Sequence, residues 1–110
     1  MNKSPGRWRR QPTPAAFVVL SDLLGRRWAL RVIWELRGGA LTFRALQAAC
    51  GRISPSVLQA RIHELSRLGI IERIPRLGYR LSASGEQLFL NLESLCDWAA
   101  GPEVAPKLKW

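Results

Sequence analysis

The chain has 110 residues, which is the size of one domain and leaves no room for a second. Its residues are 47% hydrophobic and 23% charged, a balance that excludes a disordered chain and supports a hydrophobic core. Two cysteines form no disulfide framework, and the longest apolar run, Ala15 to Leu20, is far shorter than the roughly 18 residues of a membrane span. Because no signal-peptide pattern opens the chain either, we expect a soluble protein of the cytoplasm.

Positive charge dominates the chain and is unevenly distributed. Lys and Arg number 17 against 8 Asp and Glu, a formal net charge of +9. Residues 26–80 hold eleven arginines and three glutamates, whereas residues 15–25 and 81–100 hold acids and no Lys or Arg. A generally basic surface would give the same total, but this segregation favours a phosphate-rich partner, namely nucleic acid.

The first third of the chain predicts an arm followed by two helices. Residues 1–14 combine prolines with basic side chains and no acid, so we expect a flexible basic arm. Residues 15–24 are apolar nearly all round a helix that Gly25 ends. Residues 26–37 repeat apolar positions at helical spacing until Gly38 and Gly39, and a short extended piece follows around Leu41.

The middle of the chain predicts two more helices and a hairpin. Thr42 is a suitable N-cap for a helix that reaches Ala49. Ser54 followed by Pro55 begins the clearest helix, whose apolar residues recur every three or four positions until Gly69. Residues 70–74 and 79–81 then predict two short strands joined by residues 75–78. Two helices, a turn and a hairpin describe a winged helix.

The last helix is expected to start at Ser84 and to run to about Ala100, before Gly101 and Pro102 break it. Residues 101–110 form a C-terminal tail. Both the first and the last helix carry more apolar surface than one core can absorb, which predicts a symmetric dimer through these helices. The expected interface residues are Phe17, Leu20, Leu24, Phe89, Leu92 and Cys96.

Four stretches resemble the HxlR family of winged-helix transcriptional regulators: DLLGRRWALRVIWELRGGALTFRAL, ISPSVLQARIHELSRLGIIER, YRLSASG and LCDWAAG. The match covers roughly residues 15–100, and its most specific parts are Trp28 after a basic lead-in and the entry Ile53-Ser54-Pro55. The resemblance implies a mainly α fold with a small β-hairpin, a winged helix-turn-helix with extra N- and C-terminal dimerisation helices. It further implies a prokaryotic homodimer with a recognition helix from Ser54 to Leu68 and a wing from Arg73 to Arg80.

Three features depart from the family pattern, and one of them is Ser56, where many relatives carry a basic or larger polar residue. Members that sense electrophiles or oxidants use a cysteine just before the first helix, and the segment from Pro12 to Phe17 has none, so thiol switching by that route is not expected. Cys50 and Cys96 have no metal or redox spacing and are assigned to no metal or redox site. The wing is short, which limits its reach into the minor groove.

The recognition helix and the wing supply the expected DNA contacts. Gln can pair with adenine and Arg with guanine in the major groove, and Ala can contact a thymine methyl. The expected DNA-binding residues of the helix are Ser54, Ser56, Gln59, Ala60, Arg61, His63 and Arg67, and those of the wing are Arg73, Arg76 and Arg80. Two such helices, about 34 Å apart in a dimer, predict an inverted-repeat operator on double-stranded DNA.

No nucleotide-binding glycine loop, paired carboxylates or Ser/His/Asp set is present, so we expect neither an enzyme nor a cofactor or metal site. The alternative function is a ligand-binding regulator or protein-interaction module. In it, an apolar dimer cleft near Phe89 and Trp98 holds an aromatic molecule, and DNA contact is secondary. An unidentified small-molecule effector therefore stays open as a partner besides DNA and a second copy. As a DNA-binding regulator, the protein is expected to associate with the nucleoid.

Overall fold

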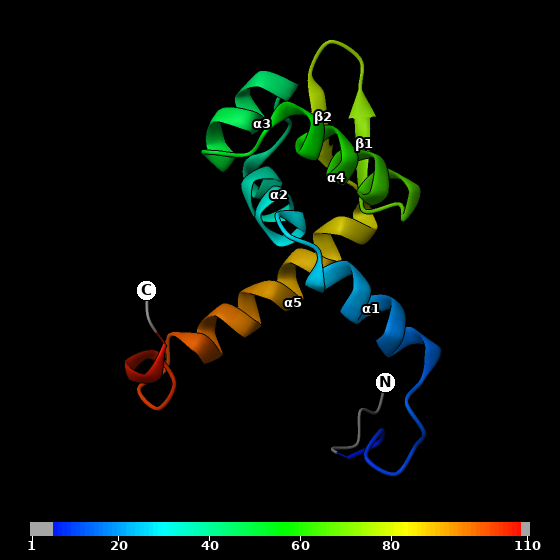
Figure 1. The fold of residues 1–110 in the computed structure, drawn as a ribbon, viewed down its shortest axis with the longest axis vertical. Helices are drawn as coiled ribbons and strands as arrows, with labels where there is room; N and C mark the ends of the chain where they lie inside the picture. Colours follow the sequence, from blue (N-terminus) through cyan, green and yellow to red (C-terminus); the bar gives the residue numbers. More distant parts are fainter. Residues whose placement is uncertain (1–5, 109–110) are drawn as a thin grey trace.

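The computed structural model describes residues 6–108, and it shows a mainly helical fold with one two-stranded hairpin (Figure 1). Residues 1–5 of the predicted arm and residues 109–110 of the predicted tail lie outside the described part. The elements in chain order are α1 (Ala15–Gly25), α2 (Ala29–Glu35), a 3₁₀ turn (Leu36–Gly38), α3 (Phe43–Cys50), α4 (Pro55–Arg67), β1 (Ile71–Ile74), β2 (Gly78–Leu81), α5 (Ala83–Ala99) and a second 3₁₀ turn (Ala105–Lys107).

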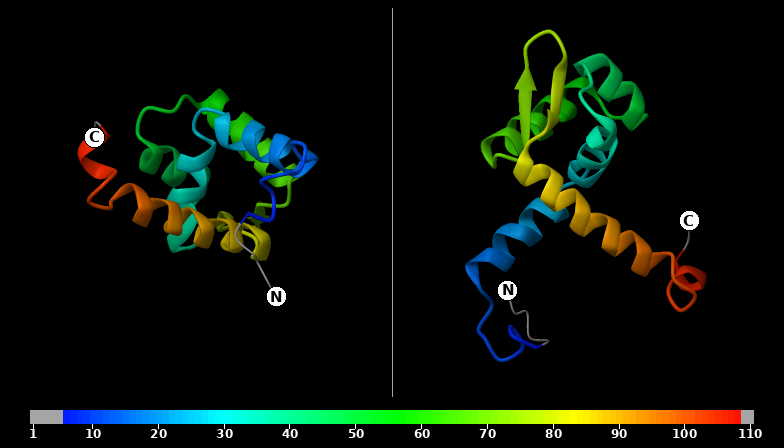
Figure 2. Two further views of the ribbon diagram at one scale, coloured as in Figure 1. Left: turned by 90° about the horizontal axis from the view of Figure 1, so that it is seen from below. Right: turned by 180° about the vertical axis from the view of Figure 1, so that it is seen from behind.

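Helices α2, α3 and α4 pack with the hairpin and the start of α5 into one body, which we call the head (Figures 1 and 2). Its core is apolar throughout, with no buried polar or charged residue among residues 6–108. The most deeply buried side chains are Val32, Ile33, Leu36, Leu46, Cys50, Leu58 and Leu65. The apolar spacing of the sequence thus predicts the buried faces of α2, α3 and α4.

The predicted N-caps of α3 and α4 are confirmed. The Thr42 hydroxyl accepts a hydrogen bond from the Ala45 amide at 3.1 Å, and the Ser54 hydroxyl accepts one from Val57 at 3.2 Å. The predicted start of α5 at Ser84 is wrong, because the cap is Ser82, whose hydroxyl accepts from the Gly85 amide at 3.0 Å. Both serines fit the capping pattern, and only the position of the preceding strand decides between them.

The second helix is shorter than its apolar spacing indicates. It covers Ala29–Glu35 rather than residues 26–37, since Trp28 adopts a left-handed conformation with φ of 76°. A non-glycine residue in that region costs about 1–3 kcal/mol and persists only where packing holds it. Trp28 is half-buried against the core and stabilises a turn that separates α1 from the head.

The hairpin has the predicted strands and a third, short partner. Ile71 pairs with Leu81 and Arg73 with Tyr79 in antiparallel register. The expected extended piece around Leu41 is confirmed, because Leu41 and Tyr79 exchange backbone hydrogen bonds of 2.9 and 2.8 Å. Gly78 is required at this contact: its φ is 105°, and a side-chain β-carbon there would lie 2.1 Å from the Leu41 oxygen.

Helices α1 and most of α5 extend away from the head as two separate rods (Figure 1). The radius of gyration is 15.7 Å, against about 13 Å for a compact domain of this length. No residue of α1 is buried. Neither rod, nor any other helix within residues 6–108, is long and apolar enough to cross a membrane.

Candidate nucleic-acid interface

Helices α3 and α4 form a helix-turn-helix at the end of the head that carries the hairpin (Figure 1). The connection is short because Gly51, with φ of 82°, ends α3 and Ser54 caps α4 three residues later. Pro55 occupies the first turn of α4, where its missing N–H costs nothing. The sequence therefore fixes where α4 begins relative to α3.

Helix α4 buries Leu58, Ile62 and Leu65 and turns the opposite side to solvent. We call this outer side the reading face. It contains five of the seven predicted helix contacts, all exposed except the half-buried Ala60: Ser56, Gln59, Ala60, His63 and Arg67. Ser54, the sixth, is exposed at the helix start, where its hydroxyl already accepts the Val57 amide.

The structure does not bring Arg61 onto the reading face. Its side chain is only 16% exposed and lies 3.6 Å from Glu64, one turn along the same helix. Its Nε atom is buried without a hydrogen-bond partner. The sequence placed Arg61 among the DNA-binding residues of the helix, but its side chain is mostly buried and its guanidinium lies beside Glu64. Arg61 is therefore not placed to contact base edges.

The three wing arginines differ in whether their charge is paired with a carboxylate. Arg73 and Arg76 are exposed, and Arg76 stands at the tip of the hairpin with φ of 69°. Arg80, also exposed, binds the Glu72 carboxylate across the hairpin at 2.7 Å. Its charge is thus partly compensated, and the wing offers two unpaired cations rather than three within the described chain.

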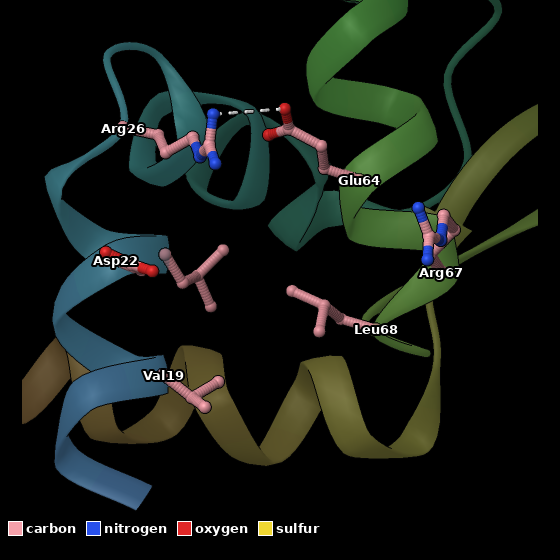
Figure 3. A pocket seen from close by; sticks show the side chains of 7 residues that line it. Val19, Asp22, Arg26, Glu64, Arg67 and Leu68 are labelled. Carbon is pink, nitrogen blue, oxygen red and sulfur yellow. Dashed lines mark ion pairs between the residues drawn. The ribbon is translucent and has the colours of Figure 1, made fainter. Parts of the chain in front are cut away.

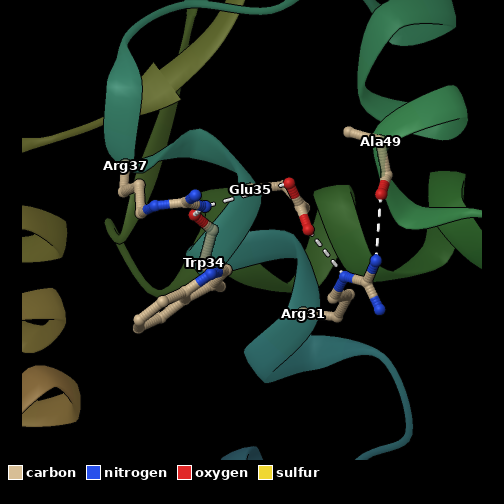
Figure 4. A network of polar contacts seen from close by, with 5 residues as sticks. All are labelled: Arg31, Trp34, Glu35, Arg37 and Ala49. Carbon is tan, nitrogen blue, oxygen red and sulfur yellow. Dashed lines mark hydrogen bonds and ion pairs between the residues drawn. The ribbon is translucent and has the colours of Figure 1, made fainter. Parts of the chain in front are cut away.

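Glu35 similarly compensates two arginines of α2 and the following turn (Figure 4). Arg31 lies 2.7 Å from that carboxylate and also donates to the Ala49 carbonyl at 3.1 Å, which ties α2 to the end of α3. Arg37 lies 3.9 Å from Glu35 and donates to the Trp34 carbonyl. These two arginines stabilise the head, and their pairing with Glu35 makes them weaker candidates for phosphate contacts than unpaired arginines.

Two exposed arginines missed by the sequence interpretation lie in the helix-turn-helix itself. Arg44 stands in the first turn of α3 and Arg52 in the turn before α4, and neither makes an ion pair with any residue among 6–108. The sequence could have indicated both, because each lies two residues from a helix cap, Thr42 or Ser54. The start of a helix favours a bound phosphate, and a nearby arginine adds to that preference.

The predicted dimer residues separate into two groups. Phe17, Leu20 and Cys96 are exposed and Leu24 is half-buried, so these side chains retain surface for a partner. Phe89 and Leu92, however, belong to the core, with 9% and 7% exposure. Phe89 packs against Trp34 with ring centroids 5.3 Å apart. Their assignment to an interface is corrected, since the start of α5 is covered by the head of the same chain.

Further apolar side chains of the two rods are also exposed and were not among the predicted dimer residues. On α1 they are Val18 and Val19, and on α5 they are Leu90, Leu95 and Trp98. The sequence carried their signal in the surplus of apolar positions on each helix, which exceeds what one core can cover.

The two cysteines differ in environment. Cys50 is buried in the core, and burial raises the pKa of its thiol, with the Glu35 carboxylate acting in the same direction and Arg31 opposing it. A protonated, buried thiol is a poor nucleophile. Cys96 is exposed on α5.

The arrangement of two helices, a connecting turn and a hairpin agrees with the comparison to known proteins. A model of the HxlR-like helix-turn-helix family matches residues 23–104. The chain belongs to the HxlR family. It is an HTH-type transcriptional regulator with DNA as its partner, as the resemblance of its sequence indicated, and the family is one of regulators rather than enzymes.

Relatives of this HxlR protein occur in several bacteria. It is 32% identical over 84 residues to the HTH-type transcriptional regulator YvaP of Bacillus subtilis, covering 71% of this chain and 78% of YvaP. It is 33% identical over 92 residues to the regulator MT3179 of Mycobacterium tuberculosis, covering 78% of this chain but 56% of that longer relative.

Solved structures of the same fold exist as well. The quinone-bound YodB of B. subtilis matches with a TM-score of 0.73 and 28% identity, covering 79% of this chain and 97% of YodB. A possible HxlR family factor from Thermoplasma volcanium matches with a TM-score of 0.67 at 23% identity, which supports the fold alone.

Proposed function

We propose that the protein binds a double-stranded, inverted-repeat operator as a homodimer and reads its sequence with α4. The observation that carries this proposal is the reading face, a solvent-facing row of polar side chains on the second helix of a helix-turn-helix. Gln59 and His63 present donors and acceptors at its centre, and Arg67 adds a guanidinium near its end. These are the groups that distinguish base pairs in the major groove.

Phosphate contacts would come from arginines around the reading face. Arg44 and Arg52 lie on the α3 side, and Arg73 and Arg76 lie on the wing. Each is exposed and lacks an ion pair within residues 6–108, so each can displace condensed counterions from DNA. Such contacts orient the head without reading sequence, which leaves discrimination to α4.

The homodimer is supported by the apolar surface of the two rods. Phe17, Val18 and Val19 on α1 are each more than half exposed, as are Leu95 and Trp98 on α5. A monomer rarely leaves this much apolar surface in contact with water, and both rods project from the same end of the head (Figure 2). A second copy, related by twofold symmetry, would cover these helices and present two recognition helices to successive grooves.

Selection of bound duplexes from a random pool, at two salt concentrations, tests this function. An enriched inverted repeat with half-sites about one helical turn apart is the expected result. Salt-sensitive binding with no enriched sequence would contradict it, because phosphate attraction alone gives that behaviour.

A second candidate function, regulation by an aromatic ligand, is favoured by an apolar groove between α2 and α5. The groove has a volume of about 510 Å³ and is lined by residues that include Leu30, Trp34, Leu95, Cys96 and Trp98. That size is typical of small-molecule sites. The related YodB has been solved with a quinone bound, which adds support for an aromatic effector.

Duroquinone is a suitable probe because its fully substituted ring resists addition of a thiol. Saturable quenching of tryptophan fluorescence that is lost in Trp98→Ala, together with weaker operator binding, is the expected result. No saturable quenching in the wild-type protein would contradict this second function.

A further inference from the structure

Helix α1 contacts the head mainly near its C-terminal end, where Leu23 packs against the core. No residue of α1 is buried, and the chain leaves it through the turn of Arg26, Arg27 and Trp28. The direction of α1 relative to α4 therefore depends on what links that turn and the flank of α1 to the recognition helix. If α1 takes part in the dimer, the same link determines how far apart two reading faces stand.

Glu64 makes this link. Its carboxylate lies 3.5 Å from the Arg26 guanidinium at the end of α1 (Figure 3), and on α4 itself it lies 3.6 Å from Arg61. Among residues 6–108, the Arg26–Glu64 contact is the single ion pair between the α1 end and α4. Glu64 comes from the flank of α4, so it contacts α1 and not the surface that would face DNA.

The open groove beside this ion pair shows how little else holds the two helices together. It has a volume of about 310 Å³ and lies between α1 and α4, lined by Val19, Asp22, Leu23, Arg26, Glu64, Arg67 and Leu68 (Figure 3). Space of this size between two helices means that their side chains do not interdigitate there. A polar contact at its edge then has more influence on the angle between them than it would have across a filled interface.

Arg61 depends on Glu64 for its compensation. Its side chain is mostly buried, its Nε has no hydrogen-bond partner, and Glu64 is the carboxylate paired with it. Without the Glu64 carboxylate between them, the positive charges of Arg61 and Arg26 would repel each other. Glu64 thus holds two like charges on the two helices close together.

We propose that Glu64 is a positioning residue that couples α1 to the recognition helix and so sets the separation of the two operator half-sites. This inference rests on the proposed function, since it requires a dimer on an inverted repeat. Glu64 contacts no base in this role. It acts by fixing the angle between the helix that joins two copies and the helix that reads DNA.

Binding to operators with different spacers tests the inference. The selected inverted repeat is rebuilt with spacers one or two base pairs longer or shorter, and affinity is measured for wild type and for Glu64→Gln. The preference of the wild type for the best spacing is expected to fall about two- to five-fold in the variant, the range for a partly exposed ion pair. Affinity for a single half-site is expected to stay unchanged.

Glu72→Gln is the matched control. It removes one carboxylate from an exposed arginine pair in the hairpin, Glu72–Arg80, that links neither α1 nor α4. It is expected to change overall affinity through the freed Arg80 and to keep the wild-type spacing preference. Equal loss of spacing preference in both variants would contradict the inference, because the effect would then come from net charge.

Arg26→Gln keeps the inference testable if Glu64→Gln unfolds. The Arg26 side chain is 53% exposed, so its replacement should leave the head folded, and it breaks the same link from the other side. An unchanged spacing profile in this folded variant would overturn the role of the Arg26–Glu64 pair. Failure of the wild type to prefer any inverted repeat would instead overturn the proposed function.

Discussion

Arginines on the head fall into two groups by what they contact. Arg31, Arg37, Arg61 and Arg80 have carboxylate partners, whereas Arg52, Arg67 and Arg76 have none among the described residues. A paired arginine gains less from a phosphate because it must first give up its partner. The number of arginines in the sequence therefore overstates the number of cations that DNA can use.

Two single variants should distinguish base recognition from phosphate attraction. Gln59→Ala removes a central hydrogen-bonding group of the reading face, and we expect a loss of about 1–3 kcal/mol on the selected operator with relaxed preference at one base pair. Arg76→Ala should weaken all duplexes similarly and lower the slope of log affinity against log salt by about one. Fluorescence anisotropy titrations on operator and random DNA measure both effects. Parallel losses from both variants on the two DNAs would contradict the assignment of α4 as the reading helix.

Arg61→Ala should behave as a packing variant. The sequence placed Arg61 among the DNA-binding residues of the helix, but its side chain is mostly buried beside Glu64. We now expect a loss of about 1–2 kcal/mol in the free energy of unfolding and an unaltered base preference. Urea denaturation and the selected base frequencies report the two quantities. A changed preference at unchanged stability would return Arg61 to the reading face.

At the scale of elements, capping serines determine where helices begin. Ser82 holds the start of α5 against the residue that precedes β1, because its hydroxyl also donates to the Ile70 carbonyl at 3.1 Å. Gly85 allows the same close approach, since a β-carbon there would lie 2.1 Å from the Ile70 oxygen. The contact fixes the angle at which α5 leaves the head.

Replacement of the two candidate caps of α5 should give unequal results. Ser82→Ala is expected to lower the free energy of unfolding by about 1 kcal/mol, because it removes the acceptor for the Gly85 amide. Ser84→Ala lies inside the helix on an exposed position and should change stability by less than about 0.5 kcal/mol. Thermal and urea unfolding of both variants, followed by circular dichroism, compare them. A larger effect at Ser84 would contradict the observed cap.

At the scale of the whole molecule, the head and the rods follow different physical rules. The head has an apolar core and packs as a single domain, whereas α1 and the second half of α5 expose apolar side chains to solvent. The head is stabilised within one chain. The apolar side chains of the rods are buried only when another surface covers them.

A charged residue on the exposed part of α5 should disrupt the proposed dimer. Leu95 is 54% exposed, so Leu95→Glu is expected to give monomers in sedimentation without loss of the head's helical signal. Leu92, which the sequence placed in the interface, does not suit this test, because at 7% exposure its replacement by a charge would unfold the core instead. Asn91→Glu, an exposed and polar position nearby, is the control for added charge. A dimer that survives Leu95→Glu would place the interface elsewhere.

Local rules were enough to predict the elements themselves. Thr42 and Ser54 cap their helices as the spacing of polar and apolar residues indicates, and the hairpin occupies the expected segment. Glycines and prolines marked most of the boundaries. These features depend on neighbours in the chain, and a sequence contains that information directly.

Only the tertiary structure decided the rest. The packing of α4 in the head leaves Arg61 mostly buried beside Glu64, and the head of the same chain covers Phe89 and Leu92 and makes them core residues. An apolar stripe in the sequence does not reveal which surface will bury it. Burial and ion pairing depend on contacts between distant segments, and those contacts exist only after the chain has folded.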